Sequence, residues 1–246
     1  MRDYKTELKK RIEFTRWQLK EAGARGIVYG NSGGKDSALV GIICKLACED
    51  TVGLVMPCGS SRNFGEDIRD ALAVAEQYGI EARTIDLSGA AGEMKRSLGA
   101  AAELTAAAIA NIAPRLRMAA LYAVSASEGR LVAGTGNRSE AYMGYFTKWG
   151  DGAYDFNPIA DLTVTEIYEF LRHLGAPGQI IEKAPSGGLF DGQTDEGEMG
   201  VSYKSIDAVL LDGRCAAEDM EIIANYHRKS EHKRKPPAVY KEGDVL

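Results

Sequence analysis

The stretch Gly26–Ala47, GIVYGNSGGKDSALVGIICKLA, places a glycine-rich turn between two different hydrophobic patterns. Residues 26–30 have strand character, and a helical pattern over 36–48 follows the turn. Glycines at such a junction let the chain turn sharply and expose backbone N–H groups, and the helix N-terminus adds a partial positive charge. The stretch therefore predicts an anion-binding loop at the carboxyl end of a strand.

Strands and helices alternate on both sides of this loop. An amphipathic helix is expected over 2–23, and a mostly helical, Ala-rich segment over 89–128. The remaining predicted elements of this half are strands at 51–56, 82–86 and 131–135 and a helix at 65–79. This alternation predicts an α/β fold, a doubly wound, Rossmann-like parallel sheet flanked by helices, with its ligand at the carboxyl ends of the strands.

The second half of the chain contains two long segments of weak periodicity. Residues 144–160 combine glycine, aromatic and charged side chains and are typical of a binding loop, and residues 184–200 form a second long loop. Helices are expected from a cap at Thr163 or Thr165 to Leu174, over 202–212 and over 216–228, before a basic tail at 229–246. Because neither a repeat nor a linker interrupts the sequence, we expect one domain over 1–246.

Composition excludes several classes of protein. The net charge of −5 argues against non-specific nucleic-acid binding, which needs clustered Lys and Arg. No apolar run is long enough for a transmembrane helix, and the charged N-terminus lacks a signal core, so we expect a cytoplasmic protein without a membrane partner. The four cysteines form no CxxC motif, so a zinc ribbon is not supported.

The glycine loop matches neither of the two familiar phosphate-binding motifs. A Walker A loop needs Ser or Thr after its Lys, but Asp36 follows Lys35, and the glycine spacing also excludes GxGxxG. The remaining pattern, SGGxDS over 32–37, offers the N–H groups of Gly33 and Gly34 and the hydroxyls of Ser32 and Ser37 to a pyrophosphate. A carboxylate at this place is best explained by a bridging Mg²⁺, although Asp36 as a helix cap is the structural alternative.

SGGxDS after the first strand resembles the signature of the ATP pyrophosphatase group, whose members adenylylate an oxygen of a substrate. The second half resembles one branch of that group through the motifs RLRM (115–118), GTGNRSE (134–140), GYFTKWGDGAYDFNP (144–158), GQTDEGEMG (192–200) and HKRKPP (232–237). These motifs resemble the ammonia-dependent NAD synthetase family over roughly residues 10–240. The resemblance implies the adenine nucleotide alpha hydrolase-like fold.

The resemblance also implies a reaction and roles for individual residues. Deamido-NAD, ATP and ammonia would give NAD, AMP and pyrophosphate through an adenylylated carboxylate, in a protein that is usually a homodimer. Asp36 and Glu140 would be the catalytic residues and ligate Mg²⁺. The residues that would contact ATP are Ser32, Gly33, Gly34, Lys35, Asp36, Ser37, Thr135 and Ser186. Those that would contact the dinucleotide are Arg115, Lys148, Asp155, His232 and Lys233.

Each transferred role has a structural alternative. Glu140 near a helix start favours the helix dipole, Asp155 can cap a turn, and Arg115 and Lys148 can be solvated charges. His232 and Lys233, in the basic tail, can be disordered in the free protein. The sequence alone does not choose between these interpretations.

Three positions depart from the family pattern. Val164 stands where many members have a Lys that contacts the phosphates, Asn31 replaces a small apolar residue, and Lys35 is a new cation within SGGxDS. We hypothesise that Lys35 partly replaces the missing Lys. These departures leave two alternatives open: a divergent ligase of the same group that acts on another carboxylate, and a non-catalytic nucleotide-binding module.

Overall fold

The computed structural model describes residues 2–58, 61–183, 185–186 and 194–240. The predicted loop at 184–200, the GQTDEGEMG motif and the tail at 229–246 therefore lie partly outside the described residues. In the first half the elements are α1 (Tyr4–Ala22), β1 (Gly26–Gly30), α2 (Lys35–Ala47), β2 (Thr51–Val55), α3 (Ser61–Phe64), α4 (Glu66–Tyr78), β3 (Glu81–Thr84), α5 (Ser88–Gly99), α6 (Ala106–Ala110), α7 (Ile112–Glu128) and β4 (Arg130–Ala133).

The second half is helical. Its elements are α8 (Arg138–Met143), α9 (Val164–Leu174), α10 (Gly178–Glu182), α11 (Asp195–Met199), α12 (Tyr203–Asp212), α13 (Ala217–Lys229) and α14 (Glu231–Arg234). Among the described residues, no helix is both long and apolar enough to cross a membrane.

The four described strands form one parallel sheet in the order β3-β2-β1-β4. Ile27 of β1 is in register with Thr51 of β2 on one side and Leu131 of β4 on the other. Because β1 is central, the loop that follows it emerges between two neighbouring strands. A reversal of strand order beside β1 is the place where such sheets bind ligands.

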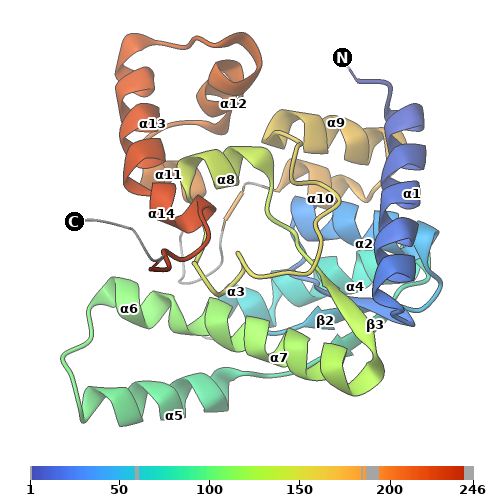
Figure 1. Ribbon diagram of the computed structural model, residues 1–246, viewed down its shortest axis with the longest axis horizontal. Coiled ribbons are helices and arrows are strands. Elements are labelled where there is room, and N and C mark those ends of the chain that lie inside the picture. The colour runs from blue at the N-terminus through green and yellow to red at the C-terminus, as the bar shows by residue number, and fades with distance from the viewer. Residues whose placement is uncertain (1, 59–60, 184, 187–193, 241–246) are drawn as a thin grey trace.

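Helices cover both faces of the sheet (Figure 1). Ile27 and Tyr29 are fully buried on the face that packs against α1, α2 and α9. Val28 and Val132 point to the opposite face, where α7 covers them. Alternate residues of β1 are therefore buried on both sides, which confirms the predicted doubly wound architecture.

The C-terminal helices form a separate layer beside α8 and α9. Met143 of α8, Val164 of α9, Ile206 of α12 and Ile223 of α13 share one hydrophobic cluster. The first part of the basic tail continues from α13 into the short helix α14. In Figure 1, α12 and α13 lie at the end of the molecule away from β2 and β3.

Candidate functional site

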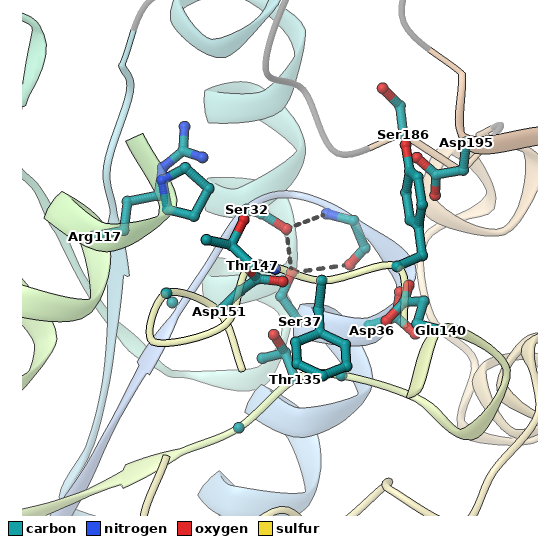
Figure 2. A pocket seen from close by; sticks show the side chains of 18 of the residues that line it. Ser32, Asp36, Ser37, Arg117, Thr135, Glu140, Thr147, Asp151, Ser186 and Asp195 are labelled. Atoms are coloured by element: carbon teal, nitrogen blue, oxygen red, sulfur yellow. Dashed lines mark hydrogen bonds between the residues drawn. The ribbon is translucent and has the colours of Figure 1, made fainter. Parts of the chain in front are cut away.

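A cleft of about 860 Å³ opens at the carboxyl ends of β1, β2 and β4. Residues of the glycine loop form its floor, and Arg117 of α7 lines one side (Figure 2). Ser186, from the connection between α10 and α11, and Asp195, the first residue of α11, line the side opposite Arg117. At the far end, Tyr226 of α13 and Lys233 of α14 complete the wall.

The glycine loop is held in shape by its own hydroxyls. The Ser37 Oγ donates to the Gly34 carbonyl oxygen at 3.0 Å, and the Ser32 Oγ, 3.1 Å from the Ser37 Oγ, accepts the Gly34 N–H at 3.3 Å. Gly33 has φ 73°, and a Cβ there would lie 2.3 Å from the Asp67 carbonyl oxygen. The turn is therefore pressed against α4 and requires glycine.

The first turns of α2 and α8 bring Asp36 and Glu140 together (Figure 2). Asp36 is in the first turn of α2, and its Oδ1 accepts the Asn137 Nδ2–H at 3.1 Å. Asn137 also caps α8: its Oδ1 accepts the Glu140 N–H at 3.0 Å, while Glu140 Oε2 accepts the Asn137 N–H at 3.1 Å. Glu140 thus has a structural role in a capping box and also faces the second carboxylate.

The pair is electrostatically costly without a cation. Burial raises the pKa of Glu140 well above its ordinary value, and the Asp36 carboxylate raises it further. Two carboxylates side by side at a phosphate loop are a typical donor set for a hard divalent cation. Among the described residues no three His, Cys, Asp or Glu side chains form a metal-binding group.

Lys35 lies against this pair. Its side chain is 5% exposed, and its Nζ is 2.7 Å from Asp36 Oδ2. Burial lowers the pKa of Lys35, but the carboxylates of Asp36 and Glu140 outweigh that effect, and the pKa is raised overall. The ammonium therefore stays charged at neutral pH.

Lys35 lies near α9, the helix that begins at Val164, where many family members have a Lys. Val164 is 4% exposed and belongs to the hydrophobic cluster of the C-terminal layer. Tyr168 lies one turn further along α9, and the Lys35 Nζ is 5.9 Å from the centre of its ring. The Lys35 ammonium thus lies beside the helix on which the family lysine is missing, as the replacement hypothesis requires; the hypothesis itself remains a prediction.

The other residues expected to contact ATP line the same cleft. Thr135 follows β4, and Ser186 follows α10, so they approach the glycine loop from different elements (Figure 2). Neither residue is near the loop in sequence. All of the predicted ATP-contacting residues except Gly33 therefore line one cavity.

Four of the five residues expected to contact the dinucleotide meet around the 144–150 segment. Arg115 donates to the Lys148 carbonyl at 3.3 Å, and the Lys148 Nζ donates to the His232 carbonyl at 2.8 Å. The Lys233 Nζ donates to the Gly144 and Phe146 carbonyls at 2.8 and 2.7 Å. Of these residues Lys233 lines the cleft, while Arg115, Lys148 and His232 do not.

Asp155 is separate from this group. Its Oδ2 accepts the Val132 N–H at 2.7 Å and its Oδ1 accepts the Tyr122 hydroxyl at 3.1 Å. It thereby attaches the 144–160 segment to β4, where Phe156 forms a bridge with Ala133. Any contact between Asp155 and a substrate remains a prediction.

Sequence reasoning missed Arg117. It donates to the Met56 carbonyl and to Asn63 Oδ1, both at 3.0 Å, and it lines the cleft (Figure 2). Arg115 and Arg117 share the RLRM motif, but residues two apart in a helix point to different sides. That geometry was available from the sequence; which arginine faces the cleft was not.

Comparison with known proteins agrees with this geometry. The family model described as NAD synthase matches residues 7–237. An NH3-dependent NAD(+) synthetase of Carboxydothermus hydrogenoformans is 45% identical over 240 residues, which cover 96% of this chain and 98% of that protein.

Solved structures are similar over the whole chain. An NMN synthetase of Francisella tularensis matches with a TM-score of 0.92 and 36% identity, covering 98% of this chain and 99% of that one. An NH3-dependent NAD synthetase of Campylobacter jejuni matches with a TM-score of 0.80 and 30% identity, covering 98% and 100%. The matched family model and these relatives show that the chain belongs to the NAD synthase family.

Proposed function

We infer that this protein is an ammonia-dependent ligase that amidates deamido-NAD, consuming ATP and releasing NAD, AMP and pyrophosphate. The observation that carries this conclusion is the single cleft in which an SGGxDS loop, the Asp36–Glu140 pair and Lys233 all meet. Membership of the NAD synthase family gives this arrangement its reaction.

In the first step a carboxylate oxygen of the pyridine ring attacks the α-phosphorus of ATP. An oxygen–phosphorus bond forms, the bond to the β-phosphate oxygen breaks, and pyrophosphate leaves with its electron pair. The N–H groups of Gly33 and Gly34 and the hydroxyls of Ser32 and Ser37 would hold that leaving group. The chain's contribution is orientation and neutralisation of charge.

Mg²⁺ fits the donor set of this site. Asp36 and Glu140 would hold it, and when bound it supplies positive charge to the phosphate oxygens. Lys35 then remains beside Asp36 as a second positive charge. This assignment is supported by the raised pKa of Glu140, which burial and the Asp36 carboxylate cause.

In the second step ammonia attacks the carbonyl carbon of the adenylylated carboxylate. A carbon–nitrogen bond forms, the bond to the AMP oxygen breaks, and the ammonium proton goes to water. The described residues that line the cleft include neither His nor Cys, so no side chain of those types is available there as a nucleophile. AMP is already a good leaving group, and a covalent enzyme intermediate is not required.

A second acceptor is favoured by one specific observation. The structure with a TM-score of 0.92 is an NMN synthetase, against 0.80 for the Campylobacter NAD synthetase. Deamido-NMN carries the same pyridine carboxylate as deamido-NAD but lacks the adenylate half. We therefore propose deamido-NMN as the alternative acceptor.

One experiment separates the acceptors. Purified protein with Mg²⁺-ATP and ammonium receives either deamido-NAD or deamido-NMN, and the amide product and AMP are followed together. Equal amounts of NAD and AMP, with a higher kcat/KM than for deamido-NMN, support the main conclusion. A preference for deamido-NMN supports the alternative. If ATP binds but neither acceptor leads to AMP formation, both proposed reactions are contradicted.

We also propose a cytoplasmic homodimer. Arg115, Lys148 and His232 contact one another but do not line the cleft, so a second subunit beside them would complete an acceptor site. The four cysteines are unpaired, as is usual in a reducing compartment. Sedimentation of the purified protein tests the dimer, and a monomer at assay concentration with full activity would contradict it.

A further inference from the structure

A buried lysine, Lys183, lies beside the glycine loop and lines the cleft, but it is not among the residues assigned to ATP so far. The Lys183 Nζ is 2.8 Å from Asp67 Oδ1 and 2.6 Å from Asp70 Oδ2, and its side chain is 9% exposed. It also donates to the Gly33 carbonyl, at 3.4 Å. One ammonium thus connects the first turns of α4 to the turn of the glycine loop.

Such a cluster is not explained by stability alone. Asp70 is 8% and Asp67 15% exposed in their side chains, so three charged groups have lost most of their water. Desolvation of buried ion pairs often cancels their mutual attraction, and apolar residues of similar size stabilise a fold as well or better. A role in fixing geometry is the better explanation.

The position of Lys183 in the chain shows what it fixes. It directly follows α10, its carbonyl accepts the Tyr168 hydroxyl at 2.9 Å, and Ser186 lies three residues further on. Pro185 and Ser186 line the cleft, and the Pro185 carbonyl accepts the Asp195 N–H at 3.3 Å. Lys183 therefore joins the segment that carries Ser186 to the loop that carries Gly33.

The floor of the loop has little freedom to move independently. The Asn31 Nδ2 donates to the Ala71 carbonyl at 3.0 Å, and Gly33 packs directly on the Asp67 carbonyl. The loop and the start of α4 thus act as one unit, to which the Lys183 ammonium attaches the opposite wall. Losing that attachment changes the distance between the two walls of the ATP end.

We propose that Lys183 is a positioning residue for ATP, acting through Asp67, Asp70 and Gly33 to set the phosphate loop against the Ser186 segment. This inference rests on the proposed function only in taking ATP as the ligand of the cleft. The acceptor end is formed by other elements, α13, α14 and the 144–150 segment, where Lys233 donates to the Gly144 and Phe146 carbonyls.

The test compares binding of Mg²⁺-ATP, by calorimetry without acceptor, with steady-state kinetics. Lys183→Met leaves two buried carboxylates without this cation and can fail to fold, so Lys183→Met/Asp70→Asn removes charge of both signs. We expect the folded variants to bind ATP about tenfold to a hundredfold more weakly, the loss typical of a charged hydrogen bond. The KM for the acceptor stays within about twofold, and Lys183→Arg restores most of the affinity.

Lys45→Met is the matched control, because Lys45 also pairs with a carboxylate, that of Glu49, but lies at the end of α2 away from the cleft. Wild-type ATP affinity in both Lys183 variants overturns the proposal, as does an equal rise of the KM values for ATP and acceptor. If the wild type binds ATP but forms no AMP, the proposed function fails, while the binding comparison still decides the role of Lys183.

Discussion

The two ends of the cleft are built in different ways. At the ATP end, hydrogen bonds join Ser32, Gly34 and Ser37, which lie within six residues of the sequence. At the acceptor end, cations from α14 and the 144–150 segment donate to backbone carbonyls far away in sequence: Lys233 to Gly144 and Phe146, and Lys148 to His232. The glycine loop is therefore held by local contacts, whereas the acceptor end depends on docking of the C-terminal layer.

This difference predicts different kinetic effects at the ATP end and at the acceptor end. A preformed phosphate loop provides its charge stabilisation without reorganisation, which favours the chemical step. Cations that contact carbonyls in the free protein must exchange those partners for ligand atoms, and that exchange appears in acceptor affinity. Substitutions at the ATP end should therefore lower kcat or the affinity for ATP. Substitutions at the acceptor end should raise the KM for the acceptor and leave the KM for ATP unchanged.

The largest effect is expected for Asp36→Asn. The amide keeps the size of the side chain but removes one of two carboxylates that face the cation site. We expect AMP formation to fall by at least about a hundredfold, as for loss of a preorganised electrostatic group. AMP release at saturating substrates measures it, with the melting temperature as the control for folding. Near-normal kcat with a normal requirement for Mg²⁺ would remove Asp36 from the site.

Gly33→Ala should be the next most damaging change. A methyl group there would lie 2.3 Å from the Asp67 carbonyl oxygen, at φ 73°. We expect a loss of about 1–3 kcal/mol in the free energy of unfolding and a strongly raised KM for ATP. Gly79→Ala is the control, because φ is 64° but no atom lies within 4 Å of the added methyl group. It should cost about 1 kcal/mol without affecting ATP; similar ATP KM values in both variants would refute the tight packing of the loop.

Lys233→Met tests the acceptor end of the cleft. Its ammonium, which lines the cleft, is expected to serve the acceptor, so KM for the dinucleotide should rise about tenfold, the value of one charged contact, with the ATP KM unchanged. Lys235→Met is the control, since that exposed side chain pairs with Glu231. A KM for ATP that rises together with the KM for the acceptor would contradict separate binding of the two substrates at the two ends.

The smallest effect is expected for Lys35→Ile. Removing this ammonium leaves the Asp36 and Glu140 carboxylates without one neighbouring cation. Because Mg²⁺ still supplies most of the charge, we expect the ATP KM to rise only by a few fold, up to about tenfold. Initial rates over a range of ATP concentrations measure it. An unchanged ATP KM would contradict the hypothesis that Lys35 substitutes for a cation at position 164.

The sheet and the glycine loop were predictable because their signals are local. The strand at 26–30 coincides with β1, and the helix expected at 36–48 begins one residue earlier, at Lys35. Thr163, one of two predicted caps, is the N-cap of α9 and forms a capping box with Glu166. Hydrophobic period, glycine and cap residues act over a few neighbours and can be read from one sequence.

The rest depends on contacts between distant segments. The short helices α8, α10, α11 and α14 carry too few turns for a periodic pattern, although Asn137 before Glu140 is a cap signal for α8. In the sequence Lys183 resembles an ordinary loop cation. Only the fold shows that it pairs with Asp67 and Asp70 of α4. The choice of Arg117 over Arg115 for the cleft depends on which side of α7 faces β2.

The transfer of AMP to the acceptor carboxylate is the central claim, and isotope transfer tests it directly. Deamido-NAD with its carboxylate oxygens replaced by a heavy oxygen isotope is converted in ordinary water with Mg²⁺-ATP and ammonium, and AMP and pyrophosphate are analysed by mass spectrometry. We predict one labelled oxygen in AMP and none in pyrophosphate, because the carboxylate oxygen attacks the α-phosphorus. Unlabelled AMP formed together with NAD, or label in pyrophosphate, would contradict the adenylylated intermediate.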